Sequence, residues 1–150
     1  MIIKTDYRIP SALDGYTLLL RNKRLHQEER EGTRKTVLFV HGATYGSSDT
    51  FDYQMSGQSW MDHLASQHFD VWCLDLLGYG QSDRPAQMDQ PADANAPIVD
   101  TAHAIQEVDH AVSFIFDQRR IEKLDLIGYS WGTAICGGYA GQYSHNVDRL

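Results

Sequence analysis

The sequence predicts an α/β fold, in which a mostly parallel sheet begins with two antiparallel-type strands and carries helices on both faces. Apolar runs of strand length at residues 36–40, 69–76 and 124–127 alternate with segments of helical periodicity. The 150 residues correspond to one domain and suffice to bury a real core. Neither an internal repeat nor a low-complexity tract nor a linker divides the chain.

The first third of the chain contains the strands that begin the sheet. Residues 1–9 and 16–23 are expected to form two strands joined across an Asp-Gly turn signal. A charged loop follows at 27–32, and we interpret its charges as a solvated turn. The continuous apolar run Thr36–Val40 predicts a strand that is buried on both faces of a parallel sheet.

Helix and strand alternate in the middle of the chain. A short helix is expected over 59–67, and the next buried strand over 69–76. Residues 84–97 contain Pro, Asp, Gln and Ala without periodicity, which predicts a long surface loop. A helix is then expected from residue 100 or 101 to the arginine pair at 119–120, whose cations suit a helix C-terminus. The apolar face of this helix consists of Ile105, Val108, Val112, Ile115 and Phe116.

The turn after the strand at 124–127 carries the main functional signal. Gly128-Tyr129-Ser130-Trp131-Gly132 has the Gly-x-Ser-x-Gly pattern of a nucleophile elbow, and a small-residue helix follows it to about residue 145. A side chain at either glycine would collide with neighbouring backbone, and strained dihedrals would present the Ser130 hydroxyl to solvent. The alternative is a strand-to-helix turn that requires glycine and holds a serine by coincidence.

Three motifs, in this order, resemble the N-terminal half of the α/β-hydrolase family. His41-Gly42 resembles the oxyanion loop of that family, residues 75–85 resemble the segment after its fourth strand, and Gly128–Gly132 resembles its elbow. The Ser-Trp-Gly core is similar to the proline iminopeptidase branch, although the His-Gly loop lacks that branch's run of glycines and proline. The resemblance implies an α/β-hydrolase core domain and a serine hydrolase that cleaves an ester, amide or thioester through an acyl-enzyme.

The resemblance also implies roles for particular residues. Ser130 would be the nucleophile, and the backbone amides of Ala43 and Trp131 would form the oxyanion hole. We interpret His41 as the residue that orders the loop beside Gly42, and not as the catalytic base. The aspartate nucleophile of the dehalogenase and epoxide hydrolase branches is excluded by the serine at position 130.

The acid and base of the family follow the nucleophile, in the order Asp and then His. After Ser130 the sequence offers only His145 and Asp148, which stand in the reverse order within the next helix and its exit. We therefore expect residues 1–150 to be the N-terminal part of a single core domain, truncated before the sixth strand, without the cap region and C-terminal half, and inactive alone. A non-catalytic α/β module that keeps the elbow without a triad is the alternative.

Composition excludes several other classes of protein. Lys plus Arg is 13 against 20 for Asp plus Glu, and this net charge of −7 argues against a nucleic-acid partner. No apolar run reaches the length of a membrane span or signal peptide, so we expect a soluble cytoplasmic protein with a small-molecule ester or amide as its substrate. Cys73 and Cys136 lie in an apolar strand and a helix, and we expect buried free thiols.

Neither a cofactor nor a metal ion is expected. Gly78-Tyr79-Gly80 follows a strand, but Asp83 stands where a dinucleotide-binding motif has its third glycine. His103 and His110 are seven residues apart on the expected helix, and no third ligand accompanies them. We interpret both histidines as solvated or packed side chains.

Overall fold

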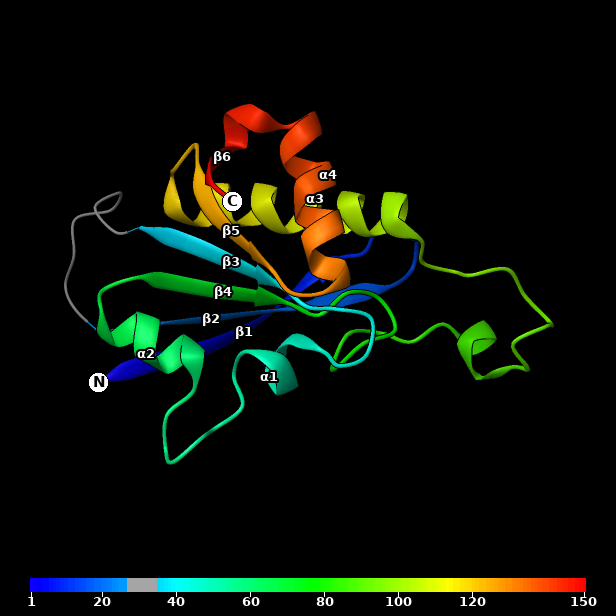
Figure 1. Ribbon diagram of the computed structural model, residues 1–150, viewed down its shortest axis with the longest axis horizontal. Coiled ribbons are helices and arrows are strands. Elements are labelled where there is room, and N and C mark those ends of the chain that lie inside the picture. The colour runs from blue at the N-terminus through cyan, green and yellow to red at the C-terminus, as the bar shows by residue number, and fades with distance from the viewer. Residues whose placement is uncertain (27–34) are drawn as a thin grey trace.

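The computed structural model describes residues 1–26 and 35–150, and its centre is a six-stranded sheet with the order β1-β2-β4-β3-β5-β6 (Figure 1). Strands β3 to β6 pair in parallel, whereas β1 pairs with β2, and β2 with β4, in the antiparallel direction. The strands are β1 (Ile2–Pro10), β2 (Thr17–Leu25), β3 (Thr36–Val40), β4 (Asp70–Leu74), β5 (Leu124–Gly128) and β6 (Val147–Arg149). The predicted α/β fold is confirmed.

Helices cover both faces of this sheet. They are α1 (Ser47–Thr50), α2 (Trp60–Ser66), α3 (Thr101–Arg119) and α4 (Trp131–Gln142), with 3-10 turns η1 (Ala86–Asp89) and η2 (Ser144–Asn146). Alternation along β3 explains the two layers, because Leu38 and Val40 belong to the core under α3 and α4, whereas Val37 and Phe39 belong to the core under α2. The short helix α1 was not predicted.

The other expected elements are present. The charged loop expected at 27–32 lies outside the described residues. The surface loop expected at 84–97 is present and contains η1. The helix expected from residue 100 or 101 is α3, whose N-cap Asp100 accepts a hydrogen bond from the amide of His103. Four of its five expected face residues are buried and Phe116 is partly buried, so the 3.6-residue periodicity was read correctly.

Both cysteines are buried free thiols, as predicted. Cys73 of β4 belongs to the core under α2, and Cys136, a residue of α4, belongs to the core on the other face of the sheet. Burial raises the pKa of the Cys136 thiol to about 12, so this group is a packing residue and not a nucleophile. Within the described part of the chain, no helix combines the length and the apolar character that a bilayer crossing requires.

The sixth strand is formed, but it is short. The three residues of β6 pair with Leu124 and Asp125 of β5, with a register irregularity between these two positions. From the sequence we expect the truncation before the sixth strand, whereas the structure places residues 147–149 in the sheet as β6. The carboxyl-terminal half of β5 pairs only with β3 among the described strands.

The parallel strands end together at one edge of the sheet. Val40 of β3 is level with Leu74 of β4 on one side and with Gly128 of β5 on the other. The loops that follow these three strands therefore meet at this carboxyl edge, although they are far apart in the sequence (Figure 1). Ligand sites of α/β sheets form at such edges.

Candidate active site

The turn between β5 and α4 has the backbone of a strained elbow. Ser130 adopts φ 55° and ψ −120°, a conformation that residues with a Cβ rarely adopt. A Cβ at Gly128 would lie 2.3 Å from the Gly132 oxygen, and a Cβ at Gly132 would lie 2.2 Å from the Val40 oxygen. Both contacts are with backbone atoms that cannot rotate away, so the turn requires glycine at both positions.

The loop after β3 lies directly against the serine. A Cβ at Gly42 would be 2.8 Å from the Ser130 Cβ and 3.3 Å from its Oγ. Among the described residues, the amides of Ala43 and Trp131 have no hydrogen-bond acceptor. Ser130 and Ala43 are exposed and Trp131 is half-buried. The structure thus brings the predicted nucleophile and oxyanion loop together at one edge of the sheet.

His41 is fully buried beneath this loop and uses both ring nitrogens. Its Nε2 accepts a hydrogen bond from the Leu76 amide at 3.1 Å, which leaves the proton on Nδ1. Nδ1 then donates to the Gly42 oxygen at 2.6 Å. Burial lowers the pKa of His41, so the ring is neutral at pH 7. Neither nitrogen is bonded to Ser130.

The segment after β4 supports the predicted oxyanion loop from the other side. The Tyr79 hydroxyl donates a hydrogen bond to the Ala43 oxygen at 3.0 Å, and its ring lies 4.7 Å from that of His41. Burial raises the pKa of Tyr79, so the phenol keeps the proton that it donates. Asp75 is buried and accepts hydrogen bonds from the amides of Ser47 at 2.6 Å and Gln81 at 2.9 Å. A carboxylate therefore joins the two loops.

Sequence reasoning missed a buried carboxylate in α3. Glu107 accepts hydrogen bonds from the Leu77 amide at 2.9 Å and from the Ser11 hydroxyl at 2.7 Å. The Nε2 of His103 lies 3.4 Å from the same carboxylate. Burial raises the pKa of Glu107. The sequence signal for this group is a charged residue at position 107 on the inner side of an amphipathic helix.

Each of the two histidines in α3 contacts another residue of the protein. His103 faces Glu107, and the Nδ1 of His110 donates to the Pro10 oxygen at 3.1 Å. In the described ranges, no group of three or more His, Cys, Asp or Glu side chains could hold a metal ion.

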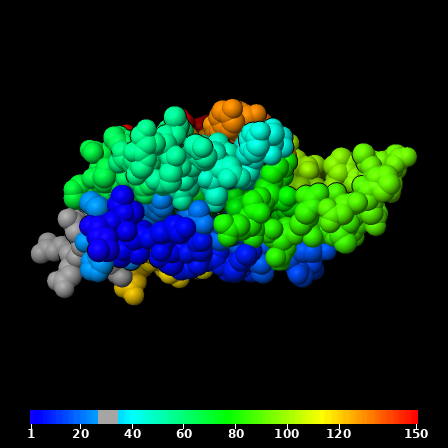
Figure 2. All heavy atoms as spheres, turned by 90° about the horizontal axis from the view of Figure 1, so that it is seen from below, coloured from blue at the N-terminus to red at the C-terminus, as the bar shows by residue number. Residues whose placement is uncertain are grey.

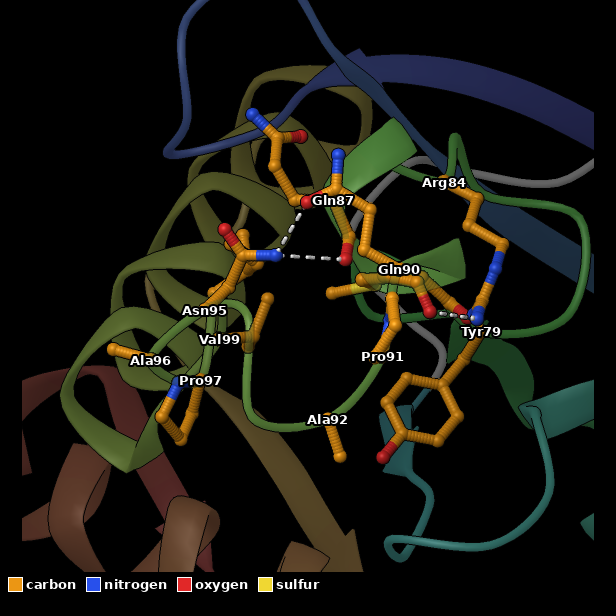
Figure 3. A pocket seen from close by; sticks show the side chains of 13 residues that line it. Tyr79, Arg84, Gln87, Gln90, Pro91, Ala92, Asn95, Ala96, Pro97 and Val99 are labelled. Atoms are coloured by element: carbon orange, nitrogen blue, oxygen red, sulfur yellow. Dashed lines mark hydrogen bonds between the residues drawn. The ribbon is translucent and has the colours of Figure 1, made fainter.

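A pocket with a volume of about 430 Å³ adjoins the site. We name it the loop pocket, and it is lined by residues of the long loop and of the segment after β4, between Gly78 and Val99. Figure 3 shows Tyr79 on one side of the loop pocket and Asn95 and Val99 on the other. The long loop projects from one end of the molecule (Figure 2).

Comparison with known proteins identifies a family and several relatives. A family model described as alpha/beta hydrolase fold matches residues 35–150. The 2-hydroxymuconate semialdehyde hydrolase of Pseudomonas sp. (strain CF600) is 30% identical over 114 residues, which are 76% of this chain and 34% of that protein. Epoxide hydrolase 1 of Caenorhabditis elegans is 23% identical over 147 residues, which are 94% of this chain and 31% of that protein.

Solved structures share the same fold. The crystal structure of a predicted CIB-like hydrolase from Thermoplasma acidophilum matches with a TM-score of 0.66 at 16% identity, covering 99% of this chain and 61% of that one. At this identity the similarity concerns the fold alone. The chain spans about a third of the length of the two curated relatives above.

Proposed function

The chain belongs to the α/β-hydrolase fold family, and from this we propose that it carries the nucleophile and oxyanion loop of a serine hydrolase acting on an ester, amide or thioester. One observation carries the proposal: the loop at Gly42 touches a serine held at φ 55° on an exposed turn. A strained, exposed serine beside unoccupied amides fits nucleophilic attack better than a packing role.

The proposed reaction begins with attack of the Ser130 Oγ on the substrate carbonyl carbon, while a base takes the hydroxyl proton. The carbonyl oxygen becomes an oxyanion, and the amides of Ala43 and Trp131 donate hydrogen bonds to it. The intermediate collapses to an acyl-serine and releases an alcohol, amine or thiol that takes up the proton. Water then hydrolyses the acyl-serine. A donor of this kind typically supplies about 3 kcal/mol of transition-state stabilisation.

We assign His41 the positioning of one of these donors. The Gly42 carbonyl and the Ala43 N–H belong to the same planar peptide unit and point in opposite directions. The hydrogen bond from Nδ1 to the Gly42 oxygen therefore sets the direction of the Ala43 N–H. The Leu76 amide in turn fixes the ring. With both nitrogens engaged, His41 is unsuited to serve as the base.

The acid and base are proposed to lie outside residues 1–150. Helix α4 has 12 residues and so separates Ser130 from His145 by about 18 Å. In the part of the chain that the structure describes, no histidine is hydrogen-bonded to the Ser130 hydroxyl. The matched parts cover only 31% and 34% of the two curated relatives, so about two thirds of each relative lies outside the match and leaves room for both residues. We also propose that residues 1–150 are the N-terminal part of one core domain.

The serine favours acyl transfer over epoxide opening. One relative is named an epoxide hydrolase, and the epoxide hydrolase branch uses an aspartate as its nucleophile. A carboxylate attacks an epoxide without a general base, whereas a serine hydroxyl requires one and suits a carbonyl. Ser130 thus directs the proposal to carbonyl substrates.

Labelling with a fluorophosphonate tests the nucleophile. The protein encoded by the complete reading frame should be labelled at Ser130, and Ser130→Ala should abolish the labelling. Ser144→Ala, an exposed serine beyond the far end of α4, is the matched control and should be labelled normally. Residues 1–150 alone should not turn over p-nitrophenyl acetate above the buffer rate. Equal labelling of Ser130→Ala would contradict the proposal and favour a non-catalytic module.

A further inference from the structure

The loop pocket adjoins the oxyanion loop and has no assigned role. We propose that it binds a neutral, mainly apolar substituent of the substrate carbonyl, and that it thereby selects which substrates Ser130 attacks. This inference rests on the proposed hydrolase function. Three features support it, namely the position of the loop pocket, the chemistry of its walls and the way in which these walls are held.

One tyrosine connects the loop pocket to the loop that lies against Ser130. Gly42 touches Ser130, Ala43 follows it, and the Ala43 oxygen accepts the hydrogen bond of the Tyr79 hydroxyl at 3.0 Å. The same Tyr79 side chain forms a wall of the loop pocket (Figure 3). Tyr79 is thus the residue shared by the loop pocket and the proposed oxyanion loop, and the proposal places one substituent of the substrate carbonyl beyond it in the loop pocket.

The walls of the loop pocket favour a neutral group. Arg84 is the one cation among the lining residues, and each of its three nitrogens makes one hydrogen bond: Nε with Asp89 at 2.8 Å, Nη1 with the Gly78 oxygen at 3.2 Å and Nη2 with the Met88 oxygen at 3.0 Å. Its charge is thus already paired with the Asp89 carboxylate, which favours a neutral ligand over an anion. No lining residue is acidic. The apolar part of the wall includes Met88, Pro91, Ala92, Pro97, Ile98 and Val99.

Apart from Tyr79 and Arg84, the polar side chains of the wall are the neutral amides of Gln87, Gln90 and Asn95. The Asn95 Nδ2 donates to the Gln90 Oε1 at 2.8 Å, which connects two turns of the long loop. These amides can accept or donate to a neutral ligand, but they do not compensate a buried charge. A volume of about 430 Å³ is within the usual range of small-molecule sites.

The walls are held in place without a ligand. A Cβ at Gly78 would lie only 2.4 Å from the Met88 sulfur, so the long loop rests closely on the segment after β4. Val99 packs against the main core, and the Ala94 amide donates to the Pro91 oxygen at 2.9 Å. The loop pocket is therefore largely formed before binding, as small-molecule sites usually are.

Three exposed alanines of the long loop provide a matched test. Ala92 and Ala96 line the loop pocket, whereas Ala94 lies between them and does not. Ala92→Trp and Ala96→Trp should fill the loop pocket, and Ala94→Trp should add the same side chain outside it. All three are on the surface, so equal thermal melts are expected.

Two substrate series locate the bound substituent. One series varies the acyl chain of p-nitrophenyl esters from acetate to hexanoate, and the other varies the alcohol of acetate esters from methyl to hexyl. In one of the two series, the filling variants should lower kcat/KM for the long member roughly tenfold or more. The short member and Ala94→Trp should change less than about twofold. Unchanged discrimination in both series, with Ser130 still labelled by fluorophosphonate, would overturn the inference.

A binding measurement tests the loop pocket as a ligand site independently of turnover. The neutral fluorescent probe N-phenyl-1-naphthylamine should bind the unmodified protein and Ala94→Trp, and hexanamide should displace it better than hexanoate. The filling variants should lose this binding. Probe binding that survives in both filling variants would refute the loop pocket as the site. Absence of Ser130 labelling in the unmodified protein would instead contradict the proposed reaction, and with it the assignment of the bound group to a substrate.

Discussion

Replacing Ser130 by glycine should stabilise the protein relative to replacing it by alanine. The backbone at this position has φ 55° and ψ −120°, where a residue with a Cβ pays a conformational penalty of about 2 kcal/mol. Alanine keeps the Cβ and therefore the strain, whereas glycine removes both. The hydroxyl is absent from both variants, so their difference isolates the backbone.

The expected size of this difference follows from two opposing terms. Glycine also makes the unfolded chain more flexible, which costs about 0.8 kcal/mol. The side chain is exposed, so little buried area is lost with the Cβ. The net expectation is that Ser130→Gly is more stable than Ser130→Ala by about 1 kcal/mol, which corresponds to a melting temperature higher by about 3 °C for a chain of this size.

Thermal melts of the two variants, together with denaturant midpoints, test this expectation. Ala134→Gly serves as the control, because Ala134 is an exposed residue in the first half of the same helix α4. There glycine should lower the stability by about 1 kcal/mol, which is the opposite sign. If Ser130→Gly melts at or below the temperature of Ser130→Ala, the elbow is not strained and the argument from its dihedrals is wrong.

Two further predictions concern the elbow and the loop beside it. Gly132→Ala should destabilise the protein by about 3 kcal/mol, because the added Cβ meets the Val40 oxygen. Gly137→Ala is the control and should not destabilise it, because Gly137 lies in α4 with open space around it. Urea unfolding measures both variants. The pKa of His41 in the folded protein lies below its usual 6.5. As the pH falls below 6.5, the unfolded chain therefore binds more protons than the folded protein, and the free energy of unfolding should decrease. His41→Gln should lose this part of the pH dependence, whereas the raised pKa of Glu107 acts with the opposite sign in both proteins and cancels in the comparison.

The elbow could be predicted because its requirements are local. The strand before it, the two glycines and the helix after it lie within about twenty consecutive residues, and each makes a separate steric demand on the same turn. The contacts of Gly128 and Gly132 with backbone atoms show why these demands leave a signature in the sequence. Strand β3 could also be predicted from the sequence, because a strand that is buried on both faces forms a continuous apolar run.

The supporting contacts could not be predicted because they join distant segments. Tyr79 and Ala43 are 36 positions apart, and Ser11 and Glu107 are 96 apart, so no periodicity links them. Residues 84–97 gave only the absence of periodicity, which predicts a loop but not a cavity. The loop pocket depends on how this segment packs on Gly78, and this tertiary contact leaves no pattern in the sequence.

Two buried carboxylates hold the segment after β4, which contacts both the proposed oxyanion loop and the loop pocket. Asp75 binds two backbone amides on the side of the oxyanion loop, and Glu107 binds the Leu77 amide on the side of α3. A buried carboxylate is costly unless such partners are present, so each favours one arrangement of the segment strongly. Tyr79 lies on this segment, between the Ala43 oxygen and the loop pocket. Glu107 thus ties this segment to α3, and Tyr79 ties the same segment to the loop at Ala43.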